Sequence, residues 1–170
     1  MCTCCISPIV TPSSCQCSDG SPFFFYVHRG TSDRVVFYLE GGGACFSAET
    51  CGPGSTSYTR NLQGETGPTG TGASGIFDLS DRRNPFRDYS MVYVPYCTGD
   101  VHLGNATHDY GNGVVVHHVG AVNSSTALAV AGAAFPDARL VAVVGASAGS
   151  AGSPLYGGLA HDVFPAASIR

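Results

Sequence analysis

The chain has 170 residues, enough for one domain with a buried core, and a formal net charge of −4 at neutral pH. Charged residues make up 12% of it, about half the usual fraction, so charge gives no reason to expect nucleic acid or an anionic membrane as a partner. No apolar run approaches the roughly 20 residues of a membrane span.

Eight cysteines indicate an oxidising compartment. Five of them lie within the first 17 residues, and three follow at positions 45, 51 and 97. Disulfides explain the set better than a zinc knuckle, because no C-x2-C pair is matched by a second one downstream; reduced buried cysteines of a cytosolic protein are the alternative. We therefore expect a secreted monomer with a cysteine-rich extension over residues 1–16 and the main domain over 17–170. An internal start at Met1 would explain why no signal peptide is seen.

The front half of the domain predicts strands over residues 23–28 and 35–39, both rich in aromatic and branched side chains. Three consecutive glycines end the second strand, and a long surface excursion rich in Gly, Thr, Ser and Pro follows over 47–74. A further strand is expected over 91–96, and then a polar loop over 98–113.

The rear half predicts an alanine-rich helix over 119–135, a buried strand over 140–144 and a further helix over 150–159. His117 and His118 are expected to open the first helix as solvated or capping residues. Strands that alternate with helices imply an α/β fold, with a largely parallel sheet and helices on both faces.

The strongest chemical signal is Gly145-Ala-Ser147-Ala-Gly149, which stands between a strand and a helix. In this context the serine lies at the apex of a sharp turn, and the glycines let strand and helix pass closely. The first helical turn also offers free N–H groups to negative charge that develops beside the serine. We expect Ser147 to be a nucleophile. The alternatives are glycines that serve packing only, or a phosphate site, for which neither the dinucleotide fingerprint nor a P-loop lysine is present.

The segment 40–43, Glu-Gly-Gly-Gly, predicts the second half of the site. A triple glycine after a central strand lets the main chain fold tightly and present bare N–H groups, as one side of an oxyanion hole. We expect the amides of Gly42, Gly43 and Ala148 to hold the oxyanion. Glu40 is expected to accept hydrogen bonds from loop amides and so shape this turn, because a buried carboxylate must be paired.

Asp100 and His102 follow the strand over 91–96, at an edge where open α/β sheets place ligands. We expect them to line an acyl or sugar pocket, with a surface-loop role as the alternative. Their spacing matches no known metal-ligand motif, and we expect no metal or other cofactor. Asn105 and Asn123 each begin an N-glycosylation sequon, which matters if the chain is secreted by a eukaryote.

Seven motifs occur in an order typical of one enzyme family. They are Cys17–Pro22, Leu39–Cys45, Thr50–Cys51, Gly75–Asp78, Asn84–Phe86, Val94–Asp100 and Gly145–Gly149. In them the chain resembles the pectin acetylesterase family, which includes the Notum-type carboxylesterases, over nearly everything after residue 17. The resemblance implies an α/β-hydrolase-like fold, Ser147 as nucleophile, no metal, and ester substrates on a glycan or an acylated protein. It also suggests a Cys45–Cys51 bridge and, by the same reasoning, a Cys17–Cys97 bridge.

One departure from the family pattern concerns the catalytic triad. In this fold an acid and then a histidine follow the serine along the chain, but only His161 and Asp162 follow Ser147. They stand about four helical turns away, some 20 Å by helix rise, too far to act as base and orienter. We therefore interpret the sequence as an N-terminal portion of a longer enzyme, truncated after the serine turn and inactive by itself.

These observations predict a serine esterase that hydrolyses acyl esters, acetyl esters above all, of a polysaccharide or protein. The alternative is a catalytically inert fragment, or a disulfide-stapled extracellular binding module that retains half of a hydrolase fold. A thioesterase or peptidase on the same scaffold is a third interpretation, because the nucleophile motif does not choose the leaving group.

Overall fold

A computed structural model of the chain describes residues 7–68 and 73–170. The first part of the expected cysteine-rich extension, with Cys2, Cys4 and Cys5, lies outside the described residues. One six-stranded sheet is formed by β1 (Ser7–Val10), β2 (Phe24–His28), β3 (Arg34–Leu39), β4 (Ser90–Val94), β7 (Leu140–Gly145) and β8 (Ser168–Ile169). Since β1 pairs with β2, the sheet begins before the boundary expected at residue 17.

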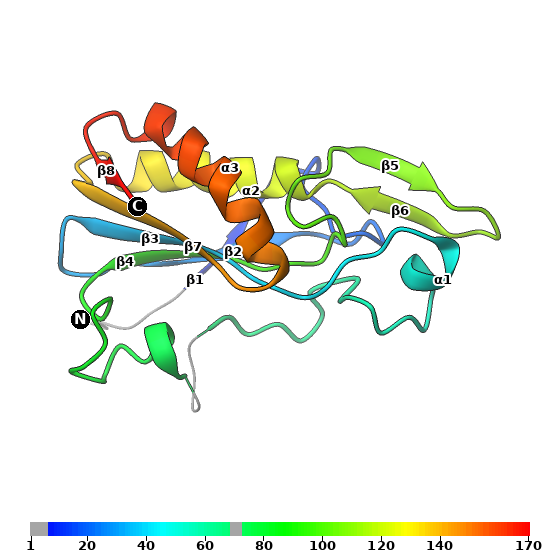
Figure 1. Ribbon diagram of the computed structural model, residues 1–170, viewed down its shortest axis with the longest axis horizontal. Coiled ribbons are helices and arrows are strands. Elements are labelled where there is room, and N and C mark those ends of the chain that lie inside the picture. Colours follow the sequence, from blue (N-terminus) through cyan, green and yellow to red (C-terminus); the bar gives the residue numbers. More distant parts are fainter. Residues whose placement is uncertain (1–6, 69–72) are drawn as a thin grey trace.

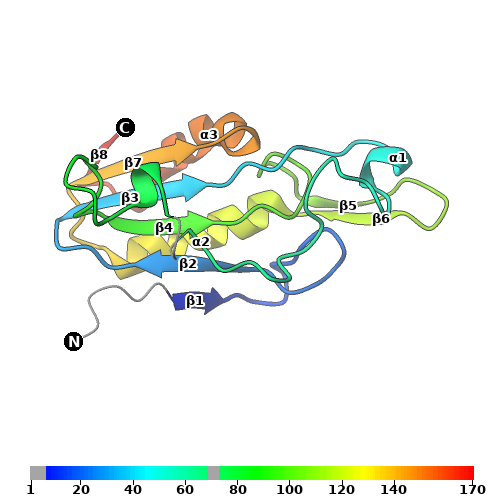
Figure 2. The same ribbon diagram turned by 90° about the horizontal axis from the view of Figure 1, so that it is seen from below.

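The strand order is β1-β2-β4-β3-β7-β8 (Figure 2). The last four strands in this order run parallel, and β2 runs antiparallel to both β1 and β4. A separate antiparallel pair, β5 (Ala106–Asp109) and β6 (Val115–His118), lies beyond the carboxyl edge of the parallel strands (Figure 1). The prediction that His117 and His118 open a helix is therefore wrong, because both residues pair in β6.

The two long helices, α2 (Gly120–Ala134) and α3 (Ala148–Val163), cover the same face of the sheet (Figure 1). The crossovers from β4 to β7 and from β7 to β8 step in one direction along the sheet, so right-handed connections place both helices on one side. The step from β3 to β4 runs the other way, and its connector crosses the opposite face. The structure thus differs from the expected helices on both faces.

That connector, residues 40–89, contains only two short regular elements in its described part, α1 (Ala48–Cys51) and the 3-10 helix η1 (Gly75–Phe77). The Phe77 ring of η1 packs edge-on against Tyr38 of β3 and Tyr93 of β4, with ring centroids 4.9 and 5.7 Å away. This aromatic cluster covers part of the face of the sheet that α2 and α3 leave open. Among the described residues, no helix is both long and apolar enough to cross a membrane.

Small side chains let α2 pack closely on the sheet. Ala127, Leu128 and Ala131 of α2 are buried against Phe37 of β3 and its neighbours in one apolar core. The central strands are buried on both faces, as expected for parallel strands with near-continuous apolar sequence. This core fixes the strand ends from which the candidate site is built.

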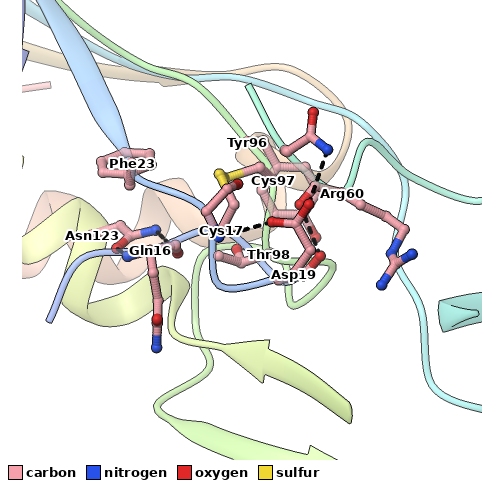
Figure 3. Close-up of a disulfide and its surroundings, with 12 residues drawn as sticks. Gln16, Cys17, Asp19, Phe23, Arg60, Tyr96, Cys97, Thr98 and Asn123 are labelled. Carbon is pink, nitrogen blue, oxygen red and sulfur yellow. Dashed lines mark hydrogen bonds between the residues drawn. A yellow bond between two sulfur atoms is a disulfide. The ribbon is translucent and has the colours of Figure 1, made fainter. Parts of the chain in front are cut away.

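Two disulfides tie the loops at the carboxyl edge. The Cys17–Cys97 bridge joins the segment before β2 to the loop after β4, next to Tyr96 and Thr98 (Figure 3). The second bridge, Cys45–Cys51, closes the chain onto α1 directly after the triple glycine. Both pairings are those that the family resemblance implied.

Candidate active site

Ser147 lies exposed in the sharp turn between β7 and α3, with φ 47° and ψ −116°. A side chain rarely adopts this backbone conformation, and such strain is characteristic of a nucleophile held clear of its sheet. A methyl group on Gly149 would overlap the Leu39 carbonyl oxygen, and one on Gly145 would overlap the Gly149 main chain. Both glycines are therefore required for β3, β7 and α3 to pass this closely.

The triple-glycine turn lies directly beside the serine. Leu39 pairs with Gly145 across the parallel strands β3 and β7, so both strands end at the same level of the sheet. A methyl group on Gly41 would lie 2.7 Å from the Ala146 carbonyl oxygen and 3.0 Å from the Ser147 Cβ. The structure thus brings together the two segments that the sequence marked as halves of one site.

The expected oxyanion amides are available for a ligand. Gly42 and Gly43 have positive φ values of 154° and 85°, and both are exposed. Within the described residues, neither their amides nor the Ala148 amide, in the first turn of α3, donates to a protein acceptor. Unpaired N–H groups at a helix start and in a glycine turn suit an anionic oxygen.

Glu40 joins this turn to the neighbouring loop. Its Oε2 atom accepts a hydrogen bond of 3.0 Å from the Tyr96 amide, two residues after β4. Burial raises the pKa of Glu40 above its ordinary value, against the effect of that hydrogen bond, which favours the carboxylate. The carboxyl thus accepts from a loop amide, as expected, but the amide belongs to the loop after β4 and not to the glycines.

Asp100 organises the loop after β4. Its Oδ1 atom accepts from the Thr98 hydroxyl at 2.6 Å and from the His102 amide at 3.1 Å. Its Oδ2 atom accepts from the amides of Gly120 at 2.7 Å and Gly104 at 3.2 Å. Because Gly120 begins α2, the carboxylate also stabilises a helix N-terminus. Both oxygens are thereby occupied, in contrast to the substrate pocket role expected for this residue.

His102 is only 1% exposed, also unlike a pocket residue. Its Nε2 lies 2.8 Å from the Glu40 carbonyl oxygen and its Nδ1 lies 2.9 Å from the Ser124 hydroxyl of α2. Burial lowers the pKa of His102 and so favours the neutral ring. Sequence reasoning missed this arrangement, since nothing local marks Ser124 as its partner.

No histidine in the part of the chain that the structure describes hydrogen-bonds to Ser147. His161 and Asp162 are exposed near the far end of α3, as expected from their sequence distance. The ligand atoms of Cys45, Cys51 and His118 lie within 4.8 Å of one another, a spacing that suits a metal. However, the two sulfurs are bonded to each other, so neither offers a thiolate.

Comparisons with known proteins agree on one family. The pectinacetylesterase family profile matches residues 7–170. An inactive palmitoleoyl-protein carboxylesterase of Danio rerio, notum1b, is 33% identical over 117 residues, which are 68% of this chain and 81% of that protein. The human palmitoleoyl-protein carboxylesterase NOTUM is 29% identical over 143 residues, 82% of this chain and 28% of that protein.

The fold agrees as well. A solved structure of the Wnt deacylase Notum from Drosophila matches with a TM-score of 0.75 and 20% identity, covering 97% of this chain and 51% of that one. The predicted α/β-hydrolase-like fold is confirmed. The chain spans most of the Danio rerio relative but less than a third of the human one.

Proposed function

The chain belongs to the pectin acetylesterase family, and we propose that it is a serine carboxylesterase with Ser147 as its nucleophile. The observation that carries the proposal is the exposed Ser147 hydroxyl, held on a strained turn beside three unpaired amides. Those amides belong to Gly42, Gly43 and Ala148. Nucleophile and oxyanion donors at one point on the edge of a sheet are the parts that acyl transfer requires.

In the proposed reaction, the Ser147 oxygen forms a bond to the ester carbonyl carbon, and the carbonyl oxygen becomes an anion facing the three amides. Collapse of this intermediate breaks the ester bond, so the alcohol leaves with a proton and an acyl group stays on Ser147. Water then attacks the acyl group, releases the carboxylic acid and restores the hydroxyl. In this reaction the chain supplies the nucleophile and the oxyanion donors, and none of its histidines is assigned as the base.

We propose acyl esters of a glycan or of an acylated protein as substrates. The family name indicates acetylated pectin, and the relatives from Danio rerio and human are named for a palmitoleoylated protein. The net charge of −4 gives no attraction to a bare polyanionic pectin backbone. Two disulfides favour an extracellular location for the protein.

One comparison favours a second candidate, an inert member of the family. The Danio rerio relative, most of which the chain spans, is named inactive. In addition, Ser147 has no histidine partner within the described residues. An inert chain would keep the fold for binding an acylated ligand.

Serine-dependent turnover separates the two candidates. We would measure hydrolysis of 4-nitrophenyl acetate and of longer acyl homologues by the protein and by its Ser147→Ala variant. Ser153→Ala removes a hydroxyl from the same helix and is the matched control, since that hydroxyl donates only to the Ser150 carbonyl. Turnover lost in Ser147→Ala and kept in Ser153→Ala supports the esterase. Equal rates in all three proteins, at the level of buffer, favour the inert form.

A further inference from the structure

The buried His102 ring links three parts of the site. Its Nε2 meets the Glu40 carbonyl oxygen at the start of the glycine turn, and its Nδ1 meets the Ser124 hydroxyl on α2. Its own carbonyl oxygen accepts a hydrogen bond of 2.7 Å from Tyr156, on the helix that begins at the nucleophile. The ring also packs on Tyr96, with ring centroids 4.7 Å apart. No other imidazole in the described residues contacts the glycine turn through a hydrogen bond.

These partners determine the tautomer of His102. A carbonyl oxygen can only accept, so Nε2 must carry the proton that it donates to Glu40. Nδ1 of the neutral ring then accepts from the Ser124 hydroxyl. Ser124 is fully buried, so solvent does not compete for its hydroxyl, and the pairing favours this form of the ring.

The Glu40 carbonyl is the point where this ring acts on the site. The Glu40 carbonyl oxygen accepts the hydrogen bond from His102 Nε2. The same oxygen lies close to Gly149 of α3, since a methyl group added to Gly149 would lie 2.8 Å from it. The peptide that follows Glu40 therefore lies between the ring and the helix behind Ser147. Its orientation sets the direction in which the chain enters Gly41, Gly42 and Gly43.

We propose that His102 is a positioning residue for the oxyanion turn. Through its Nε2–H bond to the Glu40 carbonyl, it holds the amides of Gly42 and Gly43 at the place where the carbonyl oxygen of the ester becomes an anion. This role rests on the proposed esterase function and is distinct from contact with substrate. Loss of the bond leaves a partly buried carbonyl unpaired and lets the glycine turn change its direction.

Three variants test the proposal. His102→Phe keeps a buried ring but donates nothing, whereas His102→Gln keeps an amide N–H that can reach the Glu40 carbonyl. Ser124→Ala leaves the ring in place and removes only its partner, which covers the case in which His102→Phe does not fold. The matched control is His28→Phe. His28 is a buried histidine that pairs with Met91 near the start of β4, at the opposite edge of the sheet from Ser147.

The catalytic measurement is the split between kcat and KM for 4-nitrophenyl acetate. We expect His102→Phe to lower kcat about 10- to 100-fold with KM within about twofold, because oxyanion contacts act in the transition state. His102→Gln should recover kcat to within about threefold of the wild type, and Ser124→Ala should fall between. His28→Phe should keep kcat near the wild-type value, whatever its effect on Tm. Equal losses of kcat in His102→Gln, His102→Phe and His28→Phe would show general destabilisation and overturn the proposal.

A second measurement does not depend on turnover. In ¹⁵N-labelled protein, the His102 ring should show the Nε2–H tautomer, and the amide signals of Gly41, Gly42 and Gly43 should move in His102→Phe but not in His28→Phe. Unmoved glycine signals in a folded His102→Phe, or in Ser124→Ala if His102→Phe does not fold, would overturn the positioning role. If Ser147→Ala shows no loss of turnover, the proposed function fails, and these amide signals alone decide the role of His102.

Discussion

The conformation of Ser147 predicts an unusual response to two substitutions. Ser147→Ala and Ser147→Gly both delete the hydroxyl and differ by a single methyl group. Because φ at this position is 47° and ψ is −116°, the side chain is held in a sparsely populated region of backbone space. We therefore expect the Ser147→Gly variant to be the more stable of the two.

The size of the difference follows from two opposing effects. A non-glycine residue in such a region costs about 1–3 kcal/mol. Glycine loses about 0.5–1 kcal/mol more conformational entropy on folding than alanine. The balance favours Ser147→Gly over Ser147→Ala by roughly 1 kcal/mol, which corresponds to about 2–4 °C in Tm for a domain of this size.

Thermal and urea unfolding of the two variants measure this difference. Ala151→Gly is the control, since Ala151 is exposed one turn further along α3 in ordinary helical geometry. There glycine should be the less stable residue by about 1 kcal/mol, so the two positions should respond with opposite sign. If Ser147→Gly is less stable than Ser147→Ala by a similar amount, the turn is not strained and the reasoning about Ser147 is refuted.

Three further predictions concern groups around the site. Burial raises the pKa of Glu40 in the folded state, so ionisation of this carboxyl costs stability as pH rises through that pKa. Glu40→Gln should therefore raise Tm at about pH 8 and have little effect on Tm at about pH 4, as measured by thermal unfolding. Replacing Cys17 and Cys97 together by serine should cost about 4.5 kcal/mol in urea unfolding, from the entropy of a loop whose ends are 80 residues apart. After secretion from a eukaryotic host, a glycosidase-sensitive mobility shift should disappear in Asn105→Gln and persist in Asn123→Gln, because Asn105 is exposed and Asn123 is buried in hydrogen bonds.

Much of the sheet and the serine turn could be predicted because the signals are local. The apolar runs before Glu40 and before Ser147 mark β3 and β7, and glycine spacing marks the places where chain segments cross closely. The helix α2 was expected over 119–135 and is observed over Gly120–Ala134. In each case the physical cause lies within a few residues of the pattern itself.

The features that were missed depend on partners outside their own segment. Strand β5 consists of four exposed residues, Ala-Thr-His-Asp, and carries no apolar alternation that would mark it as a strand. It forms only because it pairs with β6, where Thr107 also meets the His117 ring at 2.8 Å. His102 has a positive φ of 65° and takes its ring partners from the residue after β3 and from α2. The sequence around His102 suggests a loop that lines a pocket, whereas the observed burial of its side chain is unlike that of a pocket residue.

The difference between local signals and distant partners also separates two parts of the candidate site. One part is the serine with the oxyanion amides, and the other is the general base. The proposed nucleophile and oxyanion donors follow the ends of two neighbouring parallel strands, β3 and β7, and the register between Leu39 and Gly145 is sufficient to bring them together. A general base must reach the Ser147 hydroxyl at that same carboxyl edge. His102 is joined to that edge by a hydrogen bond to the Glu40 carbonyl oxygen, and both of its ring nitrogens are occupied. Charge stabilisation by the amides does not depend on a base, and in a serine protease it leaves roughly 10³- to 10⁴-fold catalysis when the triad is removed. A slow rate above that of buffer that persists in Ser147→Ala would therefore identify the oxyanion turn at work even where no histidine of this chain takes the proton.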